Sequence, residues 1–147
     1  MATITREPVP ATVELAVLTW LFAVATGVGE ALVRLLLPDA PTLDALAVRF
    51  GIYAVVVALV LALRTGYNPV RWTLAIGLGV VGTLSLVVEP ITWWIAGGSP
   101  ARFLASADAP TLAITALRLL HVLAVLAALA LVFHPRSAPF FRKPPRP

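Results

Sequence analysis

The sequence predicts an all-α fold, an integral membrane bundle of four transmembrane helices, and two observations carry the prediction. The chain has 147 residues, of which 60% are hydrophobic and 12% charged, with a mean hydropathy of +0.95. Soluble domains are about half apolar and about a quarter charged, so this composition argues against a water-soluble globule. The chain also holds four apolar segments, each long enough to cross a bilayer core of about 30 Å as a helix.

Breaker residues (proline, glycine and charged side chains) separate the four segments. Backbone groups in hydrocarbon must pair internally, as they do in helices, and the alternating strands of a transmembrane barrel are missing from the sequence. The first apolar segment is too long for a signal-peptide core, so we expect a retained helix. The predicted spans are residues of about 13–37, 43–63, 72–95 and 111–133. They form a domain (13–134) between a cytoplasmic segment (1–12) and a basic, proline-rich cytoplasmic tail (135–147).

The distribution of Lys and Arg predicts the orientation, because these residues collect at the cytoplasmic ends of spans. One side of the predicted membrane carries only Arg102, and the other side carries seven basic residues. The seven are Arg6, Arg64, Arg71, Arg136, Arg142, Lys143 and Arg146. We therefore expect both termini in the cytoplasm. Trp72 and the pair Trp93 and Trp94 lie where interfacial aromatic belts are expected.

The basic tail predicts contact with anionic lipid headgroups, since Lys and Arg beside a span attract such headgroups with about 1 kcal/mol per charge. The plainer interpretation is that these residues only set the topology. So short a tail predicts no nucleic-acid partner. The residues concerned are Arg136, Arg142, Lys143 and Arg146.

Ionisable residues inside the predicted spans are the strongest site candidates, because each costs at least about 2.5–3.5 kcal/mol at mid-bilayer. Glu14 lies near the cytoplasmic entry of the first span. The other six lie in the outer half of the bilayer or at its edge and come from all four spans. They are Glu30, Arg34, Arg49, Glu89, Arg118 and His121. Arg118 is deep enough to require a carboxylate partner, for which Glu30 and Glu89 are the candidates.

Two interpretations of this charged layer stay open. The residues are either interhelical pairs and rim charges, as Arg34 and Arg49 suggest, or the lining of an outward-open polar pocket that binds an anionic group or relays a proton. Glu30 and Arg34 can also pair along one helix. His121 lacks a second metal ligand nearby, and haem would need histidines from another helix. The sequence therefore predicts no metal and no cofactor.

Small residues on two spans predict close helix packing. On the first span they recur at three- and four-residue steps and end at Glu30, so we expect this stripe to face the bundle. The stripe is Ala16, Thr19, Ala23, Thr26 and Gly27. On the third span, Gly77, Gly79 and Gly82 form a G-x-G-x-x-G pattern. No strand precedes it, so it predicts a packing face for self-association or a larger membrane complex rather than a dinucleotide site.

Pro90 follows Glu89 on the third span and lacks the N–H that would bond one turn back. Two structures fit such a residue. It kinks the helix beside the carboxylate, or it marks a helix end near the interface.

Two stretches resemble a known group of proteins. Residues 61–72 resemble the L-R-x-G-x-N-W-A-R turn of small, mostly uncharacterised four-span integral membrane proteins of actinobacteria. Residues 132–142 are similar to the F-x-P-x-x-x-x-Y-F-R motif at the C-terminal end of that group. Pro69 stands where the group has tryptophan, and Phe140 replaces its tyrosine. The resemblance implies a four-span fold and an actinobacterial source, hence a bacterial inner membrane, and it implies no activity.

Three function classes remain. The absence of cysteine removes disulfides, Cys-ligated zinc, iron–sulfur clusters and thiol nucleophiles. No catalytic residue is identified, so we favour an accessory or structural subunit of a membrane assembly. The alternatives are a membrane enzyme acting on lipid or quinone, and a small-solute, ion or proton-coupled transporter that uses Glu30, Glu89, Arg118 and His121.

Overall fold

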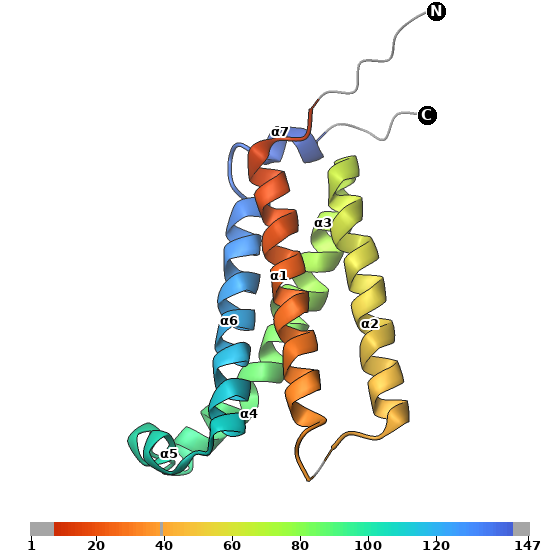
Figure 1. Ribbon diagram of the computed structural model, residues 1–147. Coiled ribbons are helices and arrows are strands. Elements are labelled where there is room, and N and C mark those ends of the chain that lie inside the picture. The colour runs from red at the N-terminus through yellow and green to blue at the C-terminus, as the bar shows by residue number, and fades with distance from the viewer. Residues whose placement is uncertain (1–7, 39, 143–147) are drawn as a thin grey trace, which may run out of the picture.

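Four long helical segments stand side by side in the computed structural model, which describes residues 8–38 and 40–142 (Figure 1). All four are long and apolar enough to cross a membrane. The predicted all-α, four-helix class is therefore confirmed. Three segments are α1 (Ala11–Arg34), α2 (Leu43–Ala62) with the one-turn helix η1 (Leu63–Thr65), and α6 (Ala109–Val132).

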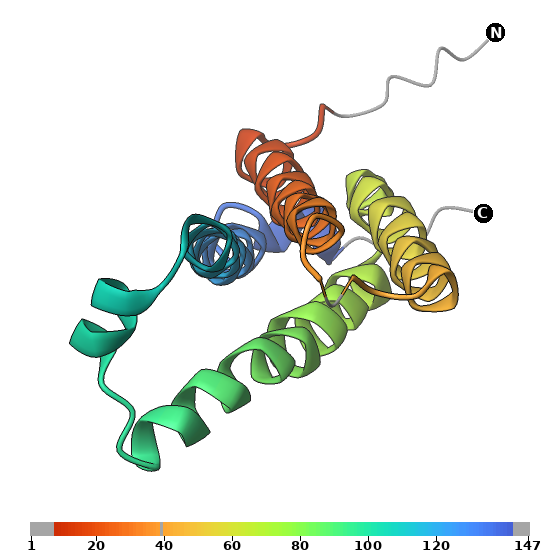
Figure 2. The same ribbon diagram turned by 60° about the horizontal axis from the view of Figure 1, so that its bottom comes forward.

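The remaining long segment is one continuous helix that changes from α-helix to π-helix and back to α-helix. It consists of α3 (Asn68–Leu74), the π-helix η2 (Ala75–Gly82) and α4 (Thr83–Ile95). The helix continues through Pro90 to Ile95, so a helix end at Pro90 is wrong, and the kink stays a prediction. Figure 2 shows α4 diverging from α1 and α2, and no residue of α4 is buried.

Two short helices were not expected. Helix α5 (Pro100–Ser106) forms in the outer loop, where proline opens the helix and the Ser99 side chain accepts a bond from the Arg102 N–H at 3.4 Å. Helix α7 (Ala138–Phe141) forms in the tail, which carried no helical period in the sequence.

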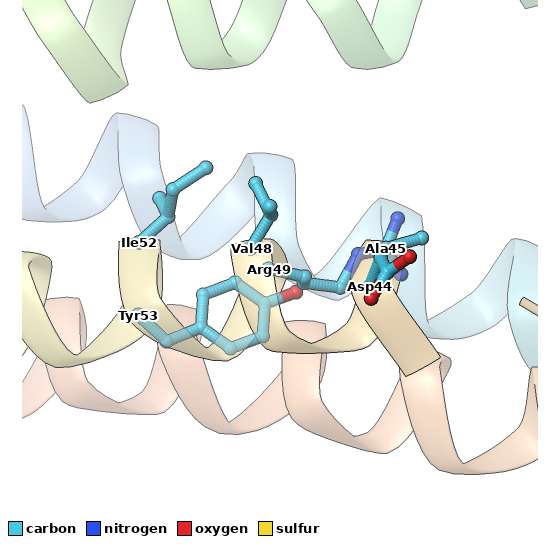
Figure 3. Close-up of a pocket in the computed structure, with 6 residues that line it drawn as sticks. All are labelled: Asp44, Ala45, Val48, Arg49, Ile52 and Tyr53. Atoms are coloured by element: carbon cyan, nitrogen blue, oxygen red, sulfur yellow. The ribbon is translucent and has the colours of Figure 1, made fainter. Parts of the chain in front are cut away.

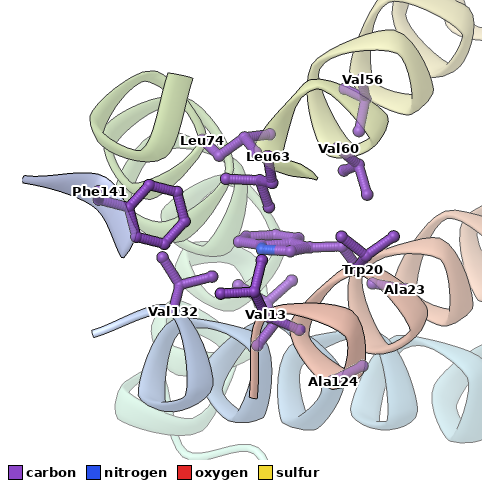
Figure 4. Packing of buried hydrophobic residues seen from close by; sticks show 14 residues of the cluster. Val13, Trp20, Ala23, Val56, Val60, Leu63, Leu74, Ala124, Val132 and Phe141 are labelled. Carbon is purple, nitrogen blue, oxygen red and sulfur yellow. The ribbon is translucent and has the colours of Figure 1, made fainter. Parts of the chain in front are cut away.

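The apolar core lies at the end of the bundle nearest the described chain termini. Figure 4 shows Trp20 at its centre, and this side chain is only 1% exposed. Side chains from α1, α2, η1, α3, α6 and α7 surround it, among them Val13, Val60, Leu63, Leu74, Val132 and Phe141. This half of the molecule is therefore packed, and the half around α4 is open.

The tail contributes to this core. Phe141 is buried in it, and the buried hydroxyl of Ser137 lies 2.8 Å from both the Thr12 hydroxyl and the Leu131 carbonyl oxygen. Gly66, with φ of 72°, ends η1 so close to the tail that a Cβ there would lie 2.8 Å from a backbone oxygen of residue 140. The tail thus closes the end of the bundle.

Helices α1 and α6 form the closest helix pair, and small residues allow it. Of the predicted stripe on α1, Ala16, Ala23, Thr26 and Gly27 are buried, so the stripe faces the bundle as expected.

The glycines of η2 behave differently from one another. A Cβ on Gly79 would lie 2.9 Å from a methyl of Leu129 on α6, whereas one on Gly77 would meet nothing within 4 Å. A Cβ on Gly82 would contact only the Gly77 carbonyl of its own span, at 3.5 Å. Only Gly79 therefore packs against another helix of this chain.

Candidate intramembrane charge site

The candidate site is centred on Glu30, in the last turns of α1. Its side chain is only 9% exposed. The Oε1 atom accepts a bond from Arg34 Nε at 2.9 Å and another from Arg118 Nε at 3.1 Å. Arg34 lies one turn further along the same helix, and Arg118 comes from α6. One buried carboxylate therefore binds two guanidinium groups and joins α1 to α6.

Arg118 extends the chain of ion pairs to the third span. Its Nη1 donates to Glu89 Oε2 on α4 at 3.4 Å. The side chain of Glu89 is 80% exposed, whereas that of Arg118 is 28% exposed. Both acids named as partners of Arg118 thus contact it, and Glu30 holds the closer and more buried contact. We define Glu30, Arg34, Glu89 and Arg118 as the ion-pair chain.

His121 lies one turn deeper and does not join the ion-pair chain. Its Nδ1 is 2.8 Å from the Ala23 carbonyl oxygen and 3.3 Å from Thr26 Oγ1. A carbonyl oxygen can only accept, so Nδ1 carries the proton and donates to it. The Thr26 hydroxyl donates to the same oxygen at 2.7 Å. His121 is therefore a second polar link between α6 and α1, and no metal-binding group of three His, Cys, Asp or Glu occurs among the described residues.

Arg49 is the sixth predicted site residue, and the structure places it elsewhere. It lies in a groove on α2 (Figure 3), and none of the ion pairs found between described residues includes it. The ion-pair chain holds two acids and two arginines, so its formal charge is zero. Of the three arginines predicted for this layer, Arg49 is the one without an acid partner among the described residues.

A further ion pair at the opposite end was missed by the sequence analysis. Arg64, in η1, donates hydrogen bonds to the Glu14 carboxylate of α1. Its Nε lies 3.1 Å from both carboxylate oxygens, and its Nη2 lies 2.8 Å from Oε2. The two residues are far apart in sequence, so no local spacing could reveal the pair. This contact joins α1 to the turn after α2.

The basic residues of the same end differ in their surroundings. The guanidinium of Arg71 lies over the rings of Phe133 and Phe141, at 4.0 and 5.2 Å from their centroids. Arg136 and Arg142 are exposed. The other two residues expected at lipid headgroups, Lys143 and Arg146, lie outside the described residues.

Asp108 begins α6 at the outer end of the bundle. Its side chain accepts a bond from the Thr111 N–H at 3.0 Å. Hydrogen bonds from Thr111 lower the pKa of Asp108 below its ordinary value. This cap fixes the start of α6.

The ion pairs of this site join helices to one another, and Glu89 is their one largely exposed carboxylate. No protein-family model matches the chain, and no curated protein or solved structure matches it either.

Proposed function

We propose that this protein resides in a bacterial inner membrane with both termini in the cytoplasm, and that it is an accessory or structural subunit of a membrane assembly. The observation that carries the proposal is the shared carboxylate of Glu30. It is buried, and it is bound by both Arg34 and Arg118. Charges that neutralise one another between helices stabilise a bundle and leave no charge for a solute.

The open half of the bundle supports the subunit role. Helix α4 buries none of its residues against the rest of the chain. A span with so few contacts is available to a neighbouring subunit, and van der Waals packing of such a face drives association in lipid. The exposed apolar residues that form this α4 face recur at three- and four-residue steps and are Leu84, Val88, Ile91 and Ile95.

The orientation can be tested directly because the chain has no cysteine. We expect a Ser106→Cys variant to react with a membrane-impermeant maleimide in intact spheroplasts, since this exposed residue ends α5. An Asn68→Cys variant, with its exposed position at the opposite end, should react only after permeabilisation. The wild-type chain is the unlabelled control, and the reverse pattern would overturn the proposed orientation.

The subunit role predicts a partner whose retention depends on the α4 face. We expect a Val88→Trp variant, extracted from its host in mild detergent, to lose a protein that co-purifies stoichiometrically with the wild type. Val55→Trp on α2 is the matched control, because the two valines are exposed to a similar degree (52% and 60%). Mass spectrometry identifies the protein and distinguishes a foreign partner from a second copy of the chain. A wild-type protein that purifies alone and monomeric contradicts the subunit role.

One observation favours a second function, a proton- or ion-coupled transporter. The ion-pair chain leads from the exposed Glu89 through Arg118 to the buried Glu30. A solvent-accessible carboxylate is therefore linked to a buried carboxylate through one arginine. In that case Glu89→Gln leaves the fold intact and abolishes pH-dependent uptake in proteoliposomes. In the subunit case it leaves both the fold and the partner unchanged.

A further inference from the structure

The outer part of α2 carries a groove that the ion-pair chain does not use. It is shallow and open, with a volume of about 560 Å³. All its lining residues belong to α2 (Figure 3), and we call it the α2 groove. The lining residues are Asp44, Ala45, Val48, Arg49, Ile52 and Tyr53.

Two opposite charges lie in the α2 groove without a described partner. Arg49 is half-buried, six residues beyond the first residue of α2 and so about 9 Å along the helix. Neither Arg49 nor Asp44 takes part in any ion pair found between described residues, and they do not pair with each other. Figure 3 shows the Arg49 side chain extending along α2 toward Asp44. The guanidinium and the carboxylate therefore both lie toward the outer end of the groove.

The inner part of the groove is apolar. Val48 and Ile52 are one helical turn apart, and Figure 3 shows both pointing to the same side of α2. They are 65% and 57% exposed, respectively. The lining of the α2 groove is thus almost wholly apolar, and two charges of opposite sign lie at its outer edge. An apolar surface beside a charge pair matches the acyl chain and zwitterionic headgroup of a phospholipid.

We propose that the α2 groove binds an aminophospholipid with an ethanolamine headgroup. Arg49 binds the phosphate, because a guanidinium presents two parallel N–H donors to phosphate oxygens. Asp44 accepts hydrogen bonds from the primary ammonium, and Val48 and Ile52 contact an acyl chain. A lipid phosphate also neutralises an arginine that would otherwise lie uncompensated inside the span. The proposal rests on the membrane location proposed above, and it is independent of the subunit role and of the orientation.

The chemistry distinguishes ethanolamine from the two other common headgroups. A glycerol headgroup has no cation for Asp44, so the lipid's negative charge meets an unshielded carboxylate. A choline headgroup is quaternary and has no N–H to donate. Only the ethanolamine lipid satisfies both Arg49 and Asp44.

The test measures which lipid remains bound to the purified protein. Full-length protein in mild detergent is mixed with equal amounts of dioleoyl phosphatidylethanolamine, phosphatidylglycerol and phosphatidylcholine, and bound lipid is quantified by native mass spectrometry. We expect the ethanolamine lipid to dominate in the wild type. Arg49→Gln should reduce its retention about tenfold, the effect of losing one charge-assisted bidentate contact. Asp44→Asn should remove the preference over phosphatidylglycerol while keeping lipid bound.

The control variant is Arg102→Gln, which removes an exposed arginine from α5 at the same end of the bundle. It should leave lipid retention unchanged. Equal retention of the three lipids by the wild type, preference for phosphatidylglycerol, or equal effects of Arg49→Gln and Arg102→Gln would each overturn the proposal. Unchanged thermal unfolding of Arg49→Gln shows that any lipid loss is local.

The outcome is separable from that of the subunit test. Arg49 lies on α2, so Arg49→Gln should keep the partner that Val88→Trp releases, and Val88→Trp should keep the lipid. A wild-type protein that keeps its partner but retains the three lipids equally rejects the lipid site alone. A wild-type protein that retains the ethanolamine lipid but purifies without a partner rejects the subunit role alone.

Discussion

Replacing Trp20 with alanine is expected to lower the free energy of unfolding by about 3–5 kcal/mol, the usual cost of emptying a large buried aromatic site. Trp20 is 1% exposed and contacts a core to which four long segments and the tail contribute. No single element can move to fill the space without losing its other contacts. The measurement is reversible unfolding in mixed detergent micelles, followed by far-UV circular dichroism.

The matched control is Trp94→Ala. Trp94 is 66% exposed on α4, so its removal should change the free energy of unfolding by less than about 1 kcal/mol. Equal losses for the two tryptophans would contradict the location of the core at the Trp20 end of the bundle.

The second large effect is expected at Glu30. A Glu30→Gln variant leaves Arg34 and Arg118 without their shared carboxylate, and breaking a buried pair of this kind costs about 3 kcal/mol. Arg118→Gln should cost less, because Arg34 still neutralises Glu30 at 2.9 Å. The double variant should be more stable than the sum of the two single losses predicts, with a coupling free energy of about 1–2 kcal/mol.

Glu89→Gln is the control for this cycle. Glu89 also contacts Arg118, but its side chain is 80% exposed and the N–O distance is 3.4 Å. Its loss should cost less than about 1 kcal/mol. If the Glu30 and Arg118 losses simply add, the two residues do not stabilise the protein through each other, and the structural role of the ion-pair chain fails.

The number of long helices could be predicted from length and hydropathy, but their ends could not. Proline is a helix breaker in the sequence, so the predicted third and fourth spans start after Pro69 and Pro110. Both prolines lie in the first turn of their helices, where a missing N–H costs nothing and the fixed φ favours the helix. These spans therefore begin earlier than predicted, at Asn68 and Ala109.

The sequence predicts how far along its helix each candidate site residue lies, but not which neighbouring helix its side chain faces. The spacing of Glu30 and Arg34 reveals their pair, because residues four apart share a helix face. Arg118 and Arg49 were assigned to the same layer from their distance along their helices. Which of them meets Glu30 depends on how α2 and α6 are rotated about their axes, and tertiary packing decides that rotation. The burial of Phe141 was missed for a similar reason, since a four-residue helix carries no periodicity.

The position of Phe141 has a consequence for biosynthesis. This side chain shares one apolar cluster with Val13 and Trp20 of the first span. The ribosome makes α1 long before it makes α7, so the cluster stays incomplete until translation has passed Phe141. In the proposed membrane location, insertion of the four spans and consolidation of their packing are therefore separate events in time, and the second waits for α7 to be made.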